Sequence, residues 1–208
     1  MKRLITLTLI ITAVCFTSCK EKPKDEENGK DSTVVVPTVK KYVIGSYYNV
    51  NGVQGIVYQL KPGDTTGMIV SLDERLCAWV DTNISTRYEN TGAIDSDDGT
   101  VNMKIIEGKG LVNYPAFDWC NKKNTGNIKS WYLPALSELL NIADVCGQLQ
   151  DSLTANKGTK LEGEYWSSTD CGNAGNTSVN AYRVQISDKG IANKTKSTVL
   201  KVRAVRVF

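Results

Sequence analysis

Apolar residues in the pattern of β-strands begin about forty residues into the chain. Residues 41–60, KYVIGSYYNVNGVQGIVYQL, contain two runs of aromatic and β-branched residues that are separated at Asn51 and Gly52. An Asn-Gly pair between two such runs is a strong signature of a two-residue hairpin turn. The same composition predicts strands at residues 55–60, 68–72 and 76–80.

The segment 81–110 is polar and punctuated by glycine, which predicts a long structured surface loop. It contains Asp95, Asp97 and Asp98, whose carboxylates would suit a hard cation. The run lacks the twelfth-position glutamate of an EF-hand loop, so we favour a solvated acidic turn and expect no metal.

Two segments in the middle of the chain have helical patterns. Residues 114–123 form the shorter candidate, with Pro115 near its start, and residues 133–149 form the longer one, with Pro134 at a plausible first helical position. The longer segment has an apolar face at helical spacing, made of Leu136, Leu139, Leu140, Ala143 and Cys146. Gly147 marks its predicted end.

The last fifty residues return to strand patterns. EYWSST is one strand, and AYRVQIS alternates Tyr182, Val184 and Ile186 against polar neighbours. VLKVRAVRVF ends the chain as a further strand region. Strands followed by two helices and then by strands again predict an α+β fold rather than a doubly wound one.

The first 18 residues have the pattern of a secretory signal peptide. Lys2 and Arg3 precede an apolar run from Leu4 to Phe16, which is too short to span a bilayer stably. The following Thr-Ser-Cys resembles a bacterial lipobox, so we expect Cys19 to be lipidated and to become the first residue of the mature protein. The alternative is an ordinary signal peptide with an incidental cysteine.

Residues 19–40 are charged and then rich in Ser, Thr, Val and Pro, which predicts a lipidated flexible tether ahead of a folded domain at 41–208. The acidic cluster 25–27 after Lys24 resembles the signal that sends some lipoproteins to the outer face of an outer membrane. A plain soluble linker is the alternative. The expected location is therefore the outer membrane, lipid-anchored and surface-exposed, with the lipid as the only membrane contact.

Composition excludes several classes of function. The 208 residues carry a net charge of +3, which is too weak to imply a nucleic-acid partner. The hydrophobic fraction of 41% is enough for a buried core. The chain has no histidine, so a His-dependent triad or a His-bearing metal helix is impossible. We expect no cofactor.

Four cysteines fall in the expected domain: Cys77, Cys120, Cys146 and Cys171. An even number in an exported domain suggests up to two disulfides, with three possible pairings. Cys120 with Cys146, which flank the helix candidates, is the first choice. The spacing matches no CxxC metal or redox pattern.

Three segments in this order, WYLPALSELL, YWSST and VRAVRVF, resemble a family of bacterial extracellular domains at the end of collagen-like adhesins and on surface lipoproteins. That family is similar to the C-type-lectin-like fold and, more distantly, to formylglycine-generating enzymes. The resemblance covers roughly Val43 to Phe208. It implies paired first and last strands, two helices packed on a sheet, and a long loop-rich face.

Several large or charged side chains have an expected place in this fold. Trp131, Trp166 and Phe208 are expected to anchor the core. Arg203 and Arg206 are expected to pair with Glu138 or Asp144, or else to face a glycan sulfate; we favour the structural role.

The resemblance also implies where a ligand binds. In relatives diversified by retroelements, the C-terminal stretch carries the variable binding residues. The matching positions here are Asn173, Asn176, Asn180, Tyr182, Asn193, Lys194 and Lys196. The alternative is a pair of ordinary polar loops.

The primary functional hypothesis is a surface-anchored module that binds a glycan or protein ligand through these loops. Relatives in adhesins bind sulfated polysaccharides, whereas the EPN and WND motifs of calcium-dependent lectins are absent here. One alternative is a structural subunit of a surface assembly. The other is an enzyme of the formylglycine-generating type, which we disfavour because the cysteines form no close C-terminal pair, so we expect no catalysis.

Overall fold

The hairpin predicted at Asn51 and Gly52 is confirmed. The computed structural model describes residues 39–84, 89–172 and 179–208, and in it these two residues connect β1 (Tyr47–Val50) to β2 (Val53–Leu60). Both have positive φ angles, 52° and 80°, as a two-residue turn of this kind requires. Val50 pairs with Val53 across the turn.

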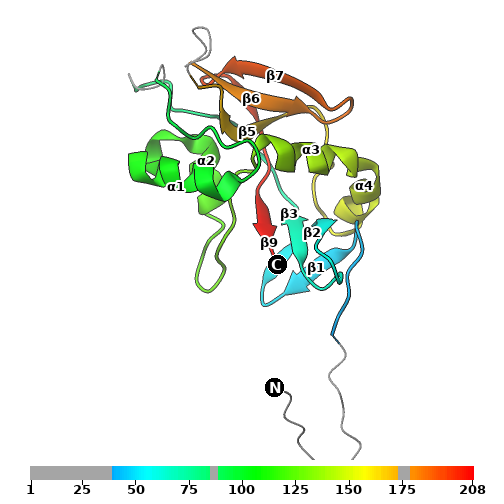
Figure 1. Cartoon of the computed structure of the whole chain (residues 1–208). Helices are drawn as coiled ribbons and strands as arrows, with labels where there is room; N and C mark the ends of the chain where they lie inside the picture. Colours follow the sequence, from blue (N-terminus) through cyan, green and yellow to red (C-terminus); the bar gives the residue numbers. More distant parts are fainter. Residues whose placement is uncertain (1–38, 85–88, 173–178) are drawn as a thin grey trace, which may run out of the picture. The chain divides into compact units, whose positions relative to one another are not determined.

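The described residues form two sheets. One has the strand order β1-β2-β3-β9, completed by β3 (Gly67–Val70) and β9 (Val205–Val207). The other has the order β4-β8-β5-β6-β7. Its strands are β4 (Arg75–Ala78), β5 (Glu164–Asp170), β6 (Asn180–Gln185), β7 (Gly190–Thr195) and β8 (Val199–Val202). Figure 1 shows the first sheet and the β5–β7 part of the second at opposite ends of the domain, with α3 (Leu136–Asp144) between them.

The last strand does not pair with the first, contrary to expectation. β9 pairs antiparallel with β3, and β1 lies at the far edge of the same sheet. The two ends of the domain meet through side chains instead. The Phe208 ring lies 4.9 Å from Tyr42 and 4.7 Å from Tyr48, measured between ring centroids. These contacts hold the final residue against the start of the domain.

The prediction of two helices is wrong, because the described residues contain four α-helices and a 3-10 turn, η2 (Leu111–Asn113). The shorter prediction is confirmed as α2 (Pro115–Asn121), with Pro115 in its first turn. The longer prediction is two helices, α3 and α4 (Cys146–Ala155), separated at Val145. Gly147 lies within α4 rather than at a helix end.

The fourth helix, α1 (Gly99–Lys109), occupies part of the predicted long loop. Gly99, at the start of this helix, has no room for a side chain, because a Cβ there would lie 2.5 Å from the Leu133 carbonyl oxygen. The acidic turn before it has a structural role. The Asp95 carboxylate accepts hydrogen bonds from two backbone N–H groups, which lower its pKa, and Asp98 caps the helix by accepting from Thr100 N–H.

The core joins both sheets and the helices. Trp79, Trp166 and Phe117 are fully buried, and Trp79 contacts Phe117 edge-to-face at 4.9 Å between ring centroids. Trp131 is also buried, so the core role predicted for both tryptophans is confirmed. Phe208 is partly buried against the same core.

Candidate ligand-binding surface

Three of the predicted ligand residues lie on one face of the β6–β7 ribbon. Asn180 is opposite Thr195 and Tyr182 is opposite Asn193 in this antiparallel pair. Successive side chains of a strand point to opposite faces, so these residues share a face with Ile191 and with its partner Val184, which is fully buried. We call Asn180, Tyr182, Ile191, Asn193 and Thr195 the Tyr182 face.

Solvent reaches the Tyr182 face. Ile191, Asn193 and Thr195 are exposed, and Asn180 and Tyr182 are half-buried. Asn180 Nδ2 donates to Asn193 Oδ1 at 3.1 Å, which links the two amides across the ribbon. Among the described residues the Tyr182 hydroxyl has no hydrogen-bond partner, and the outer atoms of both amides are also unbonded. The face therefore offers polar groups for an external partner.

Lys194 lies on the opposite face of the ribbon. Its ammonium pairs with Glu164 Oε2 at 2.9 Å, and Arg183 pairs with the other oxygen of the same carboxylate at 3.1 Å. Arg183 also donates to the Gly190 carbonyl oxygen at 3.0 Å. The prediction placed Lys194 with the other ligand residues. In the structure it belongs instead to an ion-paired group that connects β5, β6 and β7 on the side opposite the Tyr182 face.

Lys196 does not fit its predicted role as a ligand contact, because its side chain is 1% exposed. The ammonium pairs with Asp170 Oδ2 at 2.7 Å and donates to the Glu89 carbonyl oxygen at 2.8 Å. It also lies 5.2 Å from the centre of the Trp79 ring. Burial lowers the pKa of Lys196, and the bond to Asp170 opposes that change. Lys196 is a core residue.

Asp170 uses both carboxylate oxygens. Its Oδ2 accepts from the Thr91 N–H at 2.8 Å and the Thr91 hydroxyl at 2.7 Å, in addition to Lys196. Its Oδ1 accepts from Gly172 N–H at 3.1 Å. The pair thus fixes residues 89–91 and 170–172, which border the segments 85–88 and 173–178. Asn173 and Asn176 lie outside the described residues.

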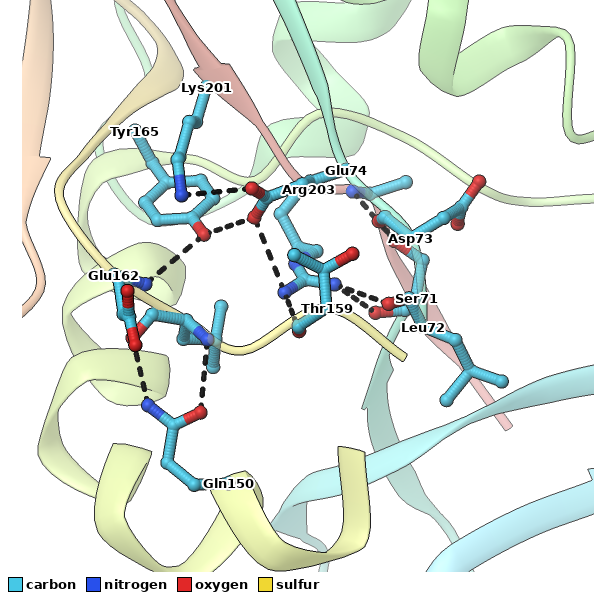
Figure 2. Close-up of polar contacts among 12 residues, drawn as sticks. Ser71, Leu72, Asp73, Glu74, Gln150, Thr159, Glu162, Tyr165, Lys201 and Arg203 are labelled. Carbon is cyan, nitrogen blue, oxygen red and sulfur yellow. Dashed lines mark hydrogen bonds and ion pairs between the residues drawn. The ribbon is translucent and has the colours of Figure 1, made fainter. Parts of the chain in front are cut away.

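A second buried cation, Arg203, holds a different part of the domain (Figure 2). Its side chain is completely buried. It donates to the carbonyl oxygens of Ser71, Leu72 and Thr159 at 3.1, 2.7 and 2.5 Å. It also lies 3.4 Å from Glu74 Oε2. Arg203 lies between β8 and β9. Its side chain therefore joins this part of the chain to the end of β3 and to the connection after α4.

Glu74 is the centre of this second cluster. Figure 2 shows its carboxylate between Arg203, Lys201 and Tyr165, with Lys201 at 2.9 Å and the Tyr165 hydroxyl donating to it. Burial and the neighbouring carboxylate raise the pKa of Tyr165 well above its usual value. Tyr165 therefore remains a neutral hydrogen-bond donor. Glu74 binds Lys201, Arg203 and Tyr165 of the domain itself, so the role of the cluster is structural.

The pairing predicted for Arg203 and Arg206 is wrong in its partners. Asp144 instead pairs with Lys189, and Glu138 accepts from backbone N–H groups. The structural role favoured for Arg203 is confirmed. Arg206 is half-buried, and its Nε donates to the neighbouring backbone at 3.3 Å.

Glu138 is a buried carboxylate at a concavity, and the sequence analysis did not propose it as a site residue. It lines a concavity of about 370 Å³ between the first sheet and the starts of α1 and α3. Its carboxylate accepts from Gly99 N–H at 3.1 Å, Ala135 N–H at 2.8 Å and the Tyr132 hydroxyl at 2.5 Å. Burial raises its pKa, and these bonds oppose that change. Both carboxylate oxygens accept from groups of the domain, so Glu138 caps the starts of α1 and α3.

The described cysteines are free thiols, which differs from the predicted disulfides. The two cysteines of the first-choice pair, Cys120 and Cys146, have different environments. Cys120 is fully buried in α2, whereas Cys146 begins α4 and accepts a hydrogen bond from Gln150 at 3.2 Å. Burial raises the pKa of Cys77 to about 11 and that of Cys171 to about 11. None of these is an activated thiolate.

Ile191 and Thr195 are members of the Tyr182 face that sequence reasoning missed. The alternation of β7 places Ile191 and Thr195 on the same side as Asn193. The sequence alone does not show that the DKG turn sets Tyr182 opposite Asn193, so it could not place these residues beside Tyr182.

Neither a metal-ligand group nor a membrane-spanning helix is present in the part of the chain that the structure describes. No cluster of three or more Cys, Asp or Glu residues there could hold a metal ion. No helix in the same residues has the length and apolar character needed to cross a membrane. Comparison with models of known protein families found no match, and comparison with curated proteins found no similar sequence.

Proposed function

We propose that this protein is a surface-anchored lipoprotein whose folded domain binds a glycan or protein ligand through the Tyr182 face. The observation that carries the proposal is the gathering of Asn180, Tyr182 and Asn193 on one solvent-accessible face. Aromatic and amide side chains supply contact area and adaptable hydrogen bonds at recognition surfaces. The function is recognition, and it involves no covalent step.

The support beneath this face favours recognition over a passive loop. Glu164 fixes β6 and β7 from the opposite side through Arg183 and Lys194. The buried pair of Lys196 and Asp170 fixes the residues that border the segment 173–178. A binding surface on a rigid support loses less conformational entropy when a ligand binds.

A lectin-like fold is part of this proposal. The α+β arrangement, the last strand in the same sheet as the first, and the contact of Phe208 with the start of the domain are compatible with it. The lipid at Cys19 and the tether 20–40 would hold the domain away from an outer membrane.

The anchor is tested by Cys19→Ser. We expect the variant to leave the membrane fraction and to appear in the soluble fraction, because the acidic residues of the tether offset its lysines and leave it little membrane affinity without lipid. Cys15→Ser is the matched control and should stay in the membrane fraction. Retention of Cys19→Ser would contradict the lipoprotein assignment.

The binding face is tested by screening the full-length protein, purified in detergent, on a glycan array with calcium and with chelator. Tyr182→Ala should remove the hits of the native protein. Tyr47→Ala is the matched control, because Tyr47 is also half-buried but belongs to β1 of the other sheet. Equal loss in both variants, or none in either, would contradict the proposed face.

A further inference from the structure

The charged residues of the β6–β7 region are arranged so that each of its cations has a carboxylate partner. Four basic residues lie between Asn180 and Lys196, and each is in an ion pair within the described residues. The pairs are Arg183 and Lys194 with Glu164, Lys189 with Asp144, and Lys196 with Asp170. With Asp188 at the turn, the formal charge of these groups is zero.

The strand register also keeps these cations away from the Tyr182 face. Arg183 is opposite Ala192, and Lys194 is opposite Ala181. These positions alternate with those of Tyr182 and Asn193, so Arg183 and Lys194 point to the other side of the ribbon. Lys196 follows the ribbon and is buried. Among the described residues, the Tyr182 face contains no charged side chain.

A sulfated or carboxylated polymer would find little to bind on such a face. Recognition of sulfate depends on charge-assisted hydrogen bonds from unpaired Lys or Arg side chains. An anion that recruited Arg183 or Lys194 would have to approach the opposite side of the ribbon, where the Glu164 carboxylate pairs with both. An anion near Lys196 would have to enter the core and displace Asp170.

The groups that the face does present match an uncharged sugar. A sugar hydroxyl both donates and accepts hydrogen bonds, and the amides of Asn180 and Asn193 and the hydroxyl of Thr195 offer both functions. The half-buried ring of Tyr182 and the exposed Ile191 supply apolar surface for the C–H side of a pyranose ring. Depletion of charge with an aromatic residue present is also typical of the centre of an interface.

We infer that the ligand of the Tyr182 face is an uncharged glycan. This inference rests on the proposed function and specifies it, because it states the chemical class that the site accepts. The expected binding is insensitive to salt, since no ion pair forms between the protein and the ligand.

The test is a glycan array that carries each oligosaccharide backbone in an unsulfated and a sulfated form. The full-length protein is applied in detergent at about 0.05 M and about 0.5 M NaCl, between which the screening length falls severalfold. We expect hits on unsulfated neutral backbones, with affinities that differ by less than about twofold between the two salts. Tyr182→Ala should weaken them by about tenfold or more.

Two further variants separate the ligand classes. Lys189→Gln removes the exposed cation that pairs with Asp144, and Arg87→Ala removes the basic residue of the segment 85–88, which lies outside the described residues. Both should keep the hits on unsulfated backbones. An anion-binding site that used either cation would lose affinity in the corresponding variant.

The outcomes distinguish the claim about the binding face from the claim about the ligand class. Hits confined to sulfated glycans, weakened by salt and lost in Tyr182→Ala, would overturn the ligand class and leave the binding face in place. Hits that persist in Tyr182→Ala, or an array with no hits on either form, would count against both the face and the class.

Discussion

Arg203 and Lys196 are two buried cations only seven residues apart in the sequence, yet the domain uses them differently. Arg203 donates mainly to backbone carbonyl oxygens of two distant segments and shares Glu74 with Lys201 and Tyr165 (Figure 2). Lys196 pairs with the Asp170 carboxylate, donates to the Glu89 carbonyl oxygen and lies over the Trp79 ring. The first ties core segments together, whereas the second fixes residues that border the candidate binding face.

The difference shows how charge can serve structure in a binding domain. A buried charge is tolerated only when it is paired or fully hydrogen-bonded. Both residues meet that condition with groups of the domain itself. In the sequence, Lys196 looked like a ligand contact because it lies in a polar lysine-containing segment. Its partner Asp170 is 26 residues away, and only the fold brings them together.

Replacing Arg203 should have the largest effect. Arg203→Met leaves three carbonyl oxygens and part of the Glu74 carboxylate without their donor, so we expect a loss of about 3–5 kcal/mol in the free energy of unfolding. Urea denaturation measures it. Arg206→Met, which removes one long hydrogen bond, is the control and should cost less than about 1 kcal/mol. Equal losses in the two variants would contradict the assigned role.

Lys196→Met should rank second, with a loss of about 2–4 kcal/mol, because Asp170 keeps its backbone donors but loses the opposite charge. Adding Asp170→Asn removes the unpaired charge. The double variant should therefore be less destabilised than the sum of the single variants, which a double-mutant cycle measures. Simple additivity would show that the pair is not energetically coupled.

Glu138 sharpens the comparison because it is a buried carboxylate without a cation. Burial raises its pKa above 4.5, so the folded state holds this proton more tightly than the unfolded state does. Its contribution to stability is therefore greatest at pH values below 4.5 and decreases as the pH rises through its folded-state pKa. We expect Glu138→Gln to remove this part of the pH dependence, measured by urea denaturation across that range. An unchanged pH profile would contradict the assignment.

The sequence predicted well those elements that are determined by turn residues, by a proline at a helix start or by strand alternation. Asn51 and Gly52 set the first hairpin, Pro115 begins α2, and the alternation at Tyr182 marks β6, because each depends on near neighbours alone. α1 was missed because Gly99 was taken as a loop residue, whereas it is required by the approach of residues 132–135. Helical periodicity also concealed the break at Val145.

The candidate site was predicted only in part, for a related reason. Composition placed Asn180, Tyr182 and Asn193 in a polar region, and the register of β6 with β7 then brought them onto one face. Composition alone could not separate them from Lys194 and Lys196. That separation depends on which side of the ribbon a residue faces and on carboxylates elsewhere in the chain.

Tyr182→Ala should change stability least and binding most. Measuring both quantities in this one variant tests the account most directly. Full-length Tyr182→Ala would be compared with the native protein for its urea midpoint and for its binding to the glycan array. We expect the free energy of unfolding to change by less than about 1 kcal/mol, since the ring is half-buried at the surface, while the array hits are lost. A large loss of stability, or hits that persist, would contradict the claim that the Tyr182 face is a binding surface on an independent scaffold.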